Sequence, residues 1–229
     1  MSAVAVFVGV VLPPVTFVVF VAAILNRLWT WKKLPQPGMT LFPTSPQGTA
    51  AGVVKETLLF PSLFRADRFL WAISWLFHAM LALIVVGHLR VMVDFPALWS
   101  ALHIDADTMS AVVGGAAGVM ILAMVILLIA RRFSLTRVRE ISAPGDYFAV
   151  FLILAIVVTG NAMRFLGHFD LGESRQYIAS LLMLRPVVPE SGWFLAHLFL
   201  GQMLLLYMPF SKIMHFGGVF FTQAAIKRS

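Results

Sequence analysis

Five long apolar segments constrain this chain more than any other feature of its sequence. Each is long enough to cross a hydrocarbon layer of about 30 Å as an α-helix. The segments run from about residue 4 to 28, 69 to 93, 110 to 130, 147 to 166 and 192 to 215. Charged residues make up 12% of the chain and hydrophobic residues 60%, whereas soluble domains carry about 25% charged residues. We therefore predict a single all-α membrane domain over residues 1–229, a bundle of five transmembrane helices.

The distribution of basic residues predicts the orientation of this bundle. Thirteen of the 17 Lys and Arg residues lie on the side that holds the C-terminus and the longest loop. Because basic residues stay on the cytoplasmic side, we expect the N-terminus outside and the C-terminus in the cytoplasm, in the cytoplasmic membrane of a prokaryote. The first segment is too long for the apolar part of a signal peptide, so we expect it to remain as a span. The net charge of +7 then reflects orientation, and no nucleic-acid partner is expected.

The longest loop, about residues 30 to 61, lies on the predicted cytoplasmic side. It is rich in Pro, Gly and Thr, carries few charges, and is longer than a simple connection between helices needs. We expect it to be a docking platform for a soluble subunit. The alternative is a loop that packs along the membrane face.

Four of the six histidines lie inside predicted spans, where ionisable residues are costly and point to function. His78 and His88 lie in the second span, and His197 and His215 in the fifth. These two spans run in opposite directions, so His78 is expected at the level of His215 near the inner face, and His88 at the level of His197 near the outer face. Two haems with two imidazole ligands each require such pairs, so we predict two b-type haems. The alternative is four histidines that hydrogen-bond between helices.

The spacing of the histidines bears on this pairing. His197 and His215 are 18 residues apart, which is five turns and about 27 Å on one face of a helix. His78 and His88 are 10 residues apart, which is about 15 Å of rise and about 80° around the helix. The mismatch requires the helices to tilt, and Pro209 is expected to bend the fifth span before His215. The chain has no cysteine, which excludes thiolate-held iron–sulfur clusters and covalently attached haem.

Other residues near the histidines fit a haem site. Gly87 and Gly201 lie where a missing side chain lets a flat macrocycle approach, although glycine is common in membrane spans in any case. Arg90, Arg164 and Lys212 lie near span ends, where they can neutralise haem propionates or simply anchor the helices at the interface. The run of small residues from 113 to 118 allows close helix packing or leaves room for a haem or a quinone tail.

The two remaining histidines lie outside the spans. His103 and His168 fall in or near the predicted outer loops, close in sequence to Asp105, Asp107 and Asp170. A quinol oxidised at the outer haem releases protons, and a histidine beside a carboxylate can accept them. The candidates for the quinone site are therefore His103, Asp105, Asp107 and His168, with solvated loop side chains as the alternative.

From about Phe69 onward the sequence resembles the haem-binding gamma subunit of respiratory nitrate reductases. The resemblance covers the segment from His78 to His88, residues 114–118, residues 131–132 and the stretch from Pro209 to His215. In that family the paired histidines are spaced by 10 residues in the second span and 18 in the fifth, as they are here. The resemblance implies that His78 and His215 bind the inner haem. It makes His88 and His197 the ligands of the outer haem, beside the quinol site.

Several stretches look closer to one branch of that family, the cytochrome b subunit of the membrane complex associated with dissimilatory sulfite reductase. They are residues 59–65, 87–90, 146–148 and 212–220. This resemblance implies electron transfer between menaquinone and a cytoplasmic iron–sulfur subunit similar to heterodisulfide reductase, with further membrane and periplasmic redox subunits as partners. The loop 94–109 departs from the nitrate reductase pattern, because it has no lysine for quinol binding. The details of that quinone site are therefore not carried over.

These features together predict the quinone-reactive electron-transfer subunit of an oxidoreductase complex, surrounded by membrane lipid, that completes no reaction alone. Sulfite-linked sulfur metabolism is the expected setting. One alternative is the quinol-oxidising cytochrome b subunit of a nitrate reductase, a hydrogenase or another membrane oxidoreductase. Another is a haemless membrane anchor or transporter.

Overall fold

The computed structural model describes residues 2–33, 49–94, 96–101, 103–167, 170–215 and 217–218 of the 229-residue chain. Among these residues there is no strand. Five helical segments are long and apolar enough to cross a membrane: Ala3–Lys33, Arg68–Leu89, Ala106–Ser134, Pro144–Phe165 and Gly192–Phe210. The prediction of an all-α protein with five membrane-length helices is confirmed, and the chain is a multi-pass membrane protein.

Each span is built from one main helix. The first span contains α1 (Ala3–Val6), the π-helical turn η1 (Phe7–Val11) and α2 (Leu12–Lys33). The other spans are α5 (Arg68–Leu89), α7 (Ala106–Ser134), α9 (Pro144–Phe165) and α11 (Gly192–Tyr207). Shorter elements are α3 (Thr49–Leu59), α4 (Pro61–Ala66), α6 (Pro96–Ala101), α8 (Thr136–Glu140), α10 (Leu171–Leu182) and the 3-10 turns η2 (Met208–Phe210) and η3 (Lys212–Met214).

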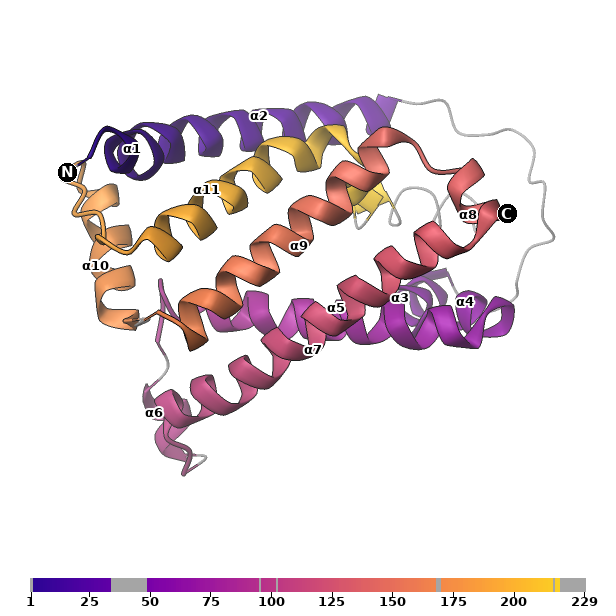
Figure 1. Cartoon of the computed structure of the whole chain (residues 1–229), viewed down its shortest axis with the longest axis horizontal. Helices are drawn as coiled ribbons and strands as arrows, with labels where there is room; N and C mark the ends of the chain where they lie inside the picture. Colours follow the sequence, from indigo (N-terminus) through magenta and orange to yellow (C-terminus); the bar gives the residue numbers. More distant parts are fainter. Residues whose placement is uncertain are drawn as a thin grey trace.

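Four of the spans form a bundle in which each helix packs against the next one in the chain (Figure 1). α5 packs against α7, α7 against α9, and α9 against α11. α2 lies outside this bundle, alongside α11. α5 and α11, which would close the ring, make no extended backbone contact in the described part of the chain. The side chains between these two helices therefore decide how the bundle closes.

A polar side chain caps the start of α5. Asp67 accepts from the N–H of Leu70 at 2.8 Å, and so satisfies a backbone donor that has no partner inside α5. Arg131, near the end of α7, reaches Asp67 at 3.1 Å and joins the neighbouring ends of two antiparallel helices. The hydrogen bond from Leu70 and the Arg131 guanidinium hold the pKa of Asp67 below its usual range. The cap therefore stays ionised at neutral pH.

The first span is irregular because its sequence cannot supply the hydrogen bonds of a continuous α-helix. In the π-helical turn the N–H of Leu12 donates to the carbonyl of Phe7, five residues earlier, and so does not serve Val8. Pro13, which would serve Gly9, has no N–H. The carbonyls of Val8 and Gly9 are therefore left without helical partners, in a segment where lipid offers none.

Two side chains from later helices satisfy these carbonyls. Gln202 of α11 donates to the Val8 carbonyl at 3.0 Å, and Tyr177 of α10 donates to the Gly9 carbonyl at 2.9 Å. Thr16 in turn donates to Gln202 at 3.4 Å. All three side chains are buried, and burial raises the pKa of Tyr177 to about 12, so this hydroxyl keeps its proton. Hydrogen bonds from α10 and α11 thus hold the first span in place. The hydropathy of the sequence does not predict these bonds.

Replacing Tyr177 with phenylalanine is expected to lower the free energy of unfolding by about 1–3 kcal/mol, the usual cost of leaving a buried polar group unsatisfied. The ring can keep its edge-on contact with Phe194, so the loss is that of the hydrogen bond. Thermal or denaturant unfolding in detergent measures it. Tyr207→Phe is the matched control, because it removes an equally long bond, 2.9 Å to the Gly145 carbonyl, at an exposed position. Equal losses in both variants would contradict the role of burial.

The fifth span differs from its prediction. One bent helix from residue 192 to 215 is predicted, but α11 ends at Tyr207 and the 3-10 turns η2 and η3 follow. Pro209 has no N–H for the helical ladder, and Ser211 is extended with φ −117° and ψ 174°. The expectation of a continuous helix to His215 is therefore wrong. The regular five-turn spacing derived for its two histidines does not apply.

On the predicted inner side, α3 and α4 lie against the start of α5. The indole N–H groups of Trp71 and Trp75 donate to the last two carbonyls of α3 at 2.8 and 3.0 Å. Phe60, between the two short helices, is left-handed with φ 48°, and its ring meets the His78 ring edge-on at 5.3 Å. Part of the predicted docking loop is therefore helical, and its residues 34–48 lie outside the described residues.

Candidate functional site

Two pairs of histidine side chains face each other between α5 and the last part of the chain. His78 of α5 lies beside His215, which follows η3, with ring centroids 5.9 Å apart and ring planes at 89°. His88 of α5 lies beside His197 of α11, with centroids 6.2 Å apart and planes at 20°. The structure thus brings together the same two pairs that the sequence predicts. The His78 pair lies at the middle of α5, and the His88 pair lies at its C-terminal end.

All four imidazoles are held through the same ring nitrogen, because each Nδ1 lies within hydrogen-bond distance of a backbone carbonyl. The acceptors are Ser74 at 2.7 Å for His78, Ile84 at 2.7 Å for His88, Ile156 at 3.1 Å for His197 and Lys212 at 3.1 Å for His215. A carbonyl oxygen only accepts, so every Nδ1 carries the proton. In the neutral imidazole Nε2 is then the unprotonated nitrogen, and none of the four Nε2 atoms has a hydrogen-bond partner among the described residues.

This arrangement suits imidazoles that bind a metal. The ligating nitrogen must be unprotonated, and the other ring nitrogen is normally fixed by a carbonyl or a carboxylate. Two imidazole nitrogens on opposite sides of one metal ion lie about 4 Å apart, because each bond is about 2 Å long, and the ring centroids then lie about 6 Å apart. The two observed separations, 5.9 and 6.2 Å, fit this spacing.

Each pair offers two ligands from the protein. Within the part of the chain that the structure describes, no group of three or more His, Cys, Asp or Glu side chains is placed to hold a metal ion. An ion held by side chains alone normally needs more than two of them. A haem iron takes its equatorial nitrogens from the macrocycle and leaves the axial positions to the protein. Two facing imidazoles therefore fit a haem better than a bare ion.

Glycines affect the outer pair in two different ways. A Cβ added at Gly87, next to His88, or at Gly201, one turn beyond His197, would meet no atom within 4 Å. The open space at both positions is compatible with a flat macrocycle. A Cβ at Gly160 of α9, in contrast, would lie 3.0 Å from Cε1 of His197. Gly160 was not predicted, and its only signal in the sequence is a glycine inside an apolar span.

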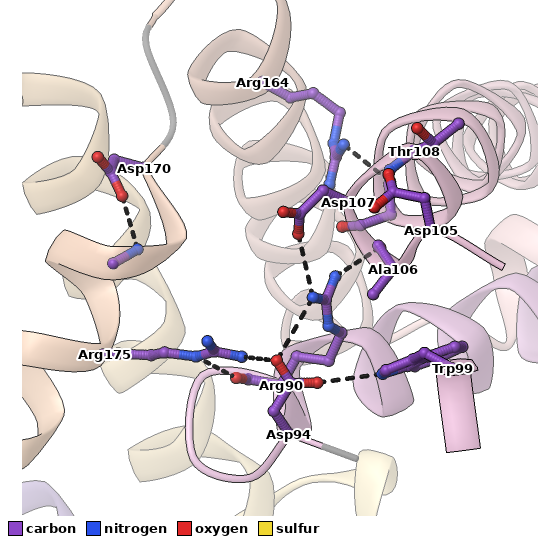
Figure 2. Close-up of polar contacts among 12 residues, drawn as sticks. Arg90, Asp94, Trp99, Asp105, Ala106, Asp107, Thr108, Arg164, Asp170 and Arg175 are labelled. Atoms are coloured by element: carbon purple, nitrogen blue, oxygen red, sulfur yellow. Dashed lines mark hydrogen bonds and ion pairs between the residues drawn. The ribbon is translucent and has the colours of Figure 1, made fainter. Parts of the chain in front are cut away.

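Arg90, two residues after His88, is the centre of an ion-pair cluster at the predicted outer end (Figure 2). It binds Asp107 at 3.1 Å and Asp94 at 3.7 Å. Arg175 of α10 binds the same Asp94 at 2.5 Å and the Arg90 carbonyl at 2.9 Å. The cluster joins the end of α5 to the start of α7 and to α10. It therefore fixes the end of the helix that carries His88.

Arg164 and Lys212, the other basic residues predicted near haem propionates, also have partners within the chain. Arg164 of α9 donates to the Ser110 carbonyl of α7 at 3.0 Å. Lys212 binds Asp146 at 2.7 Å, at the start of α9. Because Lys212 precedes His215 by three residues, this ion pair helps to place the turn that carries the histidine. All three basic residues brace helices in this structure.

The candidate residues of the quinone site do not form one cluster. Asp105 caps α7, and hydrogen bonding from Thr108 lowers the pKa of Asp105, so its carboxylate stays ionised. Asp107 belongs to the ion-pair cluster. His103 is exposed, with φ 52° in the left-handed region, and pairs with no carboxylate in the described part of the chain. His168 lies outside the described residues.

The run of small residues in α7 serves close packing at two positions. A Cβ at Gly118 would lie 2.7 Å from Oδ1 of Asn161, and one at Gly114 would lie 3.0 Å from Nη2 of Arg164. Both neighbours belong to α9, so glycine is what allows these polar side chains to lie against α7. On another face of α7, a shallow apolar groove of about 680 Å³ is bounded by Phe165.

Comparisons with known proteins indicate one family. The family described as nitrate reductase gamma subunit matches residues 61–225. The Hdr-like menaquinol oxidoreductase cytochrome b-like subunit of Archaeoglobus fulgidus is 30% identical over 260 aligned positions, which cover 93% of this chain and 77% of the relative. The subunit of the same name from Archaeoglobus profundus is 29% identical, over 95% of this chain and 78% of the relative. The nitrate reductase gamma chain of Bacillus subtilis is 27% identical over an alignment that covers 62% of this chain and 69% of the relative. The family match includes all four paired histidines, and the chain belongs to the nitrate reductase gamma subunit family.

Proposed function

We propose that this chain is a dihaem b-type cytochrome that carries electrons between a quinol and a redox partner at the opposite membrane face. The observation that carries the proposal is the two pairs of facing imidazoles, each with a protonated Nδ1 and a free Nε2. His78 and His215 hold one haem, and His88 and His197 hold the other. Family membership supports this assignment, because the matched range contains both pairs.

The two pairs lie at different depths and so provide a path across the membrane. His78 and His88 are 10 residues apart on α5, about 15 Å along the helix axis. Haem supplies one-electron chemistry, whereas a quinol gives up two electrons and two protons. The protein orients the four imidazoles through their Nδ1 atoms and leaves each Nε2 free for a metal.

We place the reaction with quinol at the end that carries His88 and His197, the predicted outer side. Both archaeal relatives are named as subunits of menaquinol oxidoreductases, which supports menaquinol as the substrate here. Asp105 and Asp107 are engaged in a helix cap and an ion-pair cluster. His103 is exposed, and it is the best candidate among the described loop residues to accept a proton from the quinol.

At the other end, the partner is a cytoplasmic iron–sulfur subunit similar to heterodisulfide reductase, in the metabolism of sulfur compounds. The relatives' name, Hdr-like, supports such a partner. The cytoplasmic loop from residue 30 to 61 is its proposed docking site. The second candidate function, quinol oxidation for a nitrate reductase, is favoured by the match to the Bacillus subtilis gamma chain.

The purified chain is expected to contain about two b-type haems, and a menaquinol analogue should reduce both of them. Haem extraction and quantitative absorption measure the first result, and reduced-minus-oxidised difference spectra measure the second. A preparation from haem-replete cells without a b-type absorption band would contradict the proposed function. Two haems that dithionite reduces but no quinol reduces would contradict the choice of electron donor.

A further inference from the structure

We propose that α9 positions the imidazole of His197 through Thr159 and Gly160, and thereby sets the reduction potential of one haem independently of the other. This inference rests on the proposed function, since it concerns a haem ligand. The residues themselves act on the imidazole and do not touch the iron, so they are positioning residues.

His197 differs from the other three histidines in how its ring is held. The Nδ1 atoms of His78 and His88 bond to carbonyls four residues earlier in their own helix, at 2.7 Å in both cases. His215 bonds to a carbonyl three residues earlier in its own turn, at 3.1 Å. His197 alone among these four reaches a neighbouring helix, where the Ile156 carbonyl of α9 lies 3.1 Å from its Nδ1. The orientation of this ring therefore depends on α9.

Thr159 gives the same proton a second acceptor. Its Oγ1 lies 3.1 Å from Nδ1 of His197. The hydroxyl proton is directed to the carbonyls of Ala155 at 2.9 Å and Ile156 at 3.0 Å. A lone pair of Oγ1 is then free to accept from the imidazole. The Nδ1 proton of His197 is thus shared between two oxygens, one of which a single substitution can remove.

Gly160, the next residue, allows the ring to approach. A Cβ at this position would lie 3.0 Å from Cε1 and 3.4 Å from Nδ1 of His197. Both atoms belong to a ring that is partly buried between helices, so a methyl group here must displace the imidazole or α9. Adjacent residues of α9 therefore supply a hydrogen bond to the ring and the space that the ring occupies.

α9 is itself held in place, so it can act as the fixed partner. Asn161, which follows Gly160, donates to the Gly118 carbonyl of α7 at 2.9 Å. Arg164, one turn later, donates to the Ser110 carbonyl of α7 at 3.0 Å. These two bonds anchor the part of α9 that faces His197 to α7.

A hydrogen bond from the non-ligating nitrogen makes an imidazole a more basic ligand. A more basic ligand favours the oxidised metal and lowers the reduction potential, as hydrogen bonding around the ligands of redox centres generally tunes their potentials. The three other histidines have no such side-chain acceptor in the described part of the chain. Loss of Thr159 should therefore raise the potential of the haem held by His197 and leave the other unchanged.

The test compares Thr159→Val, Thr159→Ser and wild-type protein, all purified with their haems, by redox titration and by low-temperature electron paramagnetic resonance. Thr159→Val should retain both haems, with one transition shifted to higher potential and one low-spin signal altered. Thr159→Ser keeps the hydroxyl and should restore the wild-type potential and signal. Gly160→Ala should alter the same low-spin signal, whereas Gly192→Ala, whose added Cβ meets no atom within 4 Å, should not.

The haem that responds must be the one that His197→Ala removes. The inference alone would be overturned if both haems are present and neither potential nor signal responds to Thr159→Val, or if the other haem shifts. A wild-type chain purified without haem would overturn the proposed function and this inference with it.

Discussion

Alanine at any one of the four paired histidines is expected to reduce the haem content from about two per chain to about one. The reason is that each proposed haem would depend on two imidazoles from different parts of the chain, whose ring centroids lie 5.9 and 6.2 Å apart in the two pairs. Variants of His78 and His215 should lose the same haem, and variants of His88 and His197 should lose the other. Haem-to-protein ratios measure how many haems remain, and the split of the low-temperature α-band shows which of the two haems is lost.

Double variants sharpen this prediction. His78→Ala combined with His215→Ala should lose no more haem than either single variant, because both act on one site. His78→Ala combined with His88→Ala should lose both haems. His103→Ala is the control, since this exposed histidine lies outside both pairs and its loss should leave both haems in place. Loss of the same haem in the His78 and His197 variants would disprove the pairing.

The second large effect is expected when haem is withheld. The chain should lose stability, and the loss should be greatest where α5 faces α11. α5 packs closely against α7 and makes no extended backbone contact with α11 in the described residues. A group bound only by the folded state stabilises it by about 4 kcal/mol when its concentration exceeds the dissociation constant 1,000-fold. Chain produced in cells unable to make haem should therefore unfold at a lower temperature than loaded chain.

Hydrogen exchange locates this effect. In the haem-free chain, amides of α5 should exchange faster, while those of α9 should change less because α9 is packed against both α7 and α11. Adding haem to the solubilised chain should restore the protection. Equal unfolding temperatures and equal exchange rates in the haem-free and haem-loaded forms would show that α5 and α11 are held together without haem.

The sequence was sufficient for the parts of the fold that depend on span length and direction. Hydropathy alone located five spans, because lipid demands about 20 apolar residues per helix. The opposite directions of the second and fifth spans then predicted which histidines meet, and the structure brings those side chains together. Whether they bind haem stays a prediction. These features depend on the order and polarity of the spans, which are properties of the sequence itself.

Other features depend on geometry that no single segment contains. Pro209 predicts a bend in the fifth span, but α11 ends at Tyr207 and Ser211 is extended, so the chain leaves the α-helix before His215. The contact of Gly160 with His197 requires the spacing of α9 and α11. The partners of Arg90 come from the segment after α5 and from the first turn of α7, so span-end position alone could not separate an ion-pair role from a propionate role.

The two satisfied carbonyls of the first span have a consequence for synthesis in the cell. The four spans of the bundle follow one another in the chain, so each can pack on its predecessor as soon as both have left the ribosome. The first span packs instead against the last. Until Tyr177 and Gln202 have been made, the carbonyls of Gly9 and Val8 lack the partners that they have in the finished protein, and lipid supplies no substitute. A nascent or truncated chain that ends before Tyr177 therefore lacks both side-chain donors to the carbonyls of its first span.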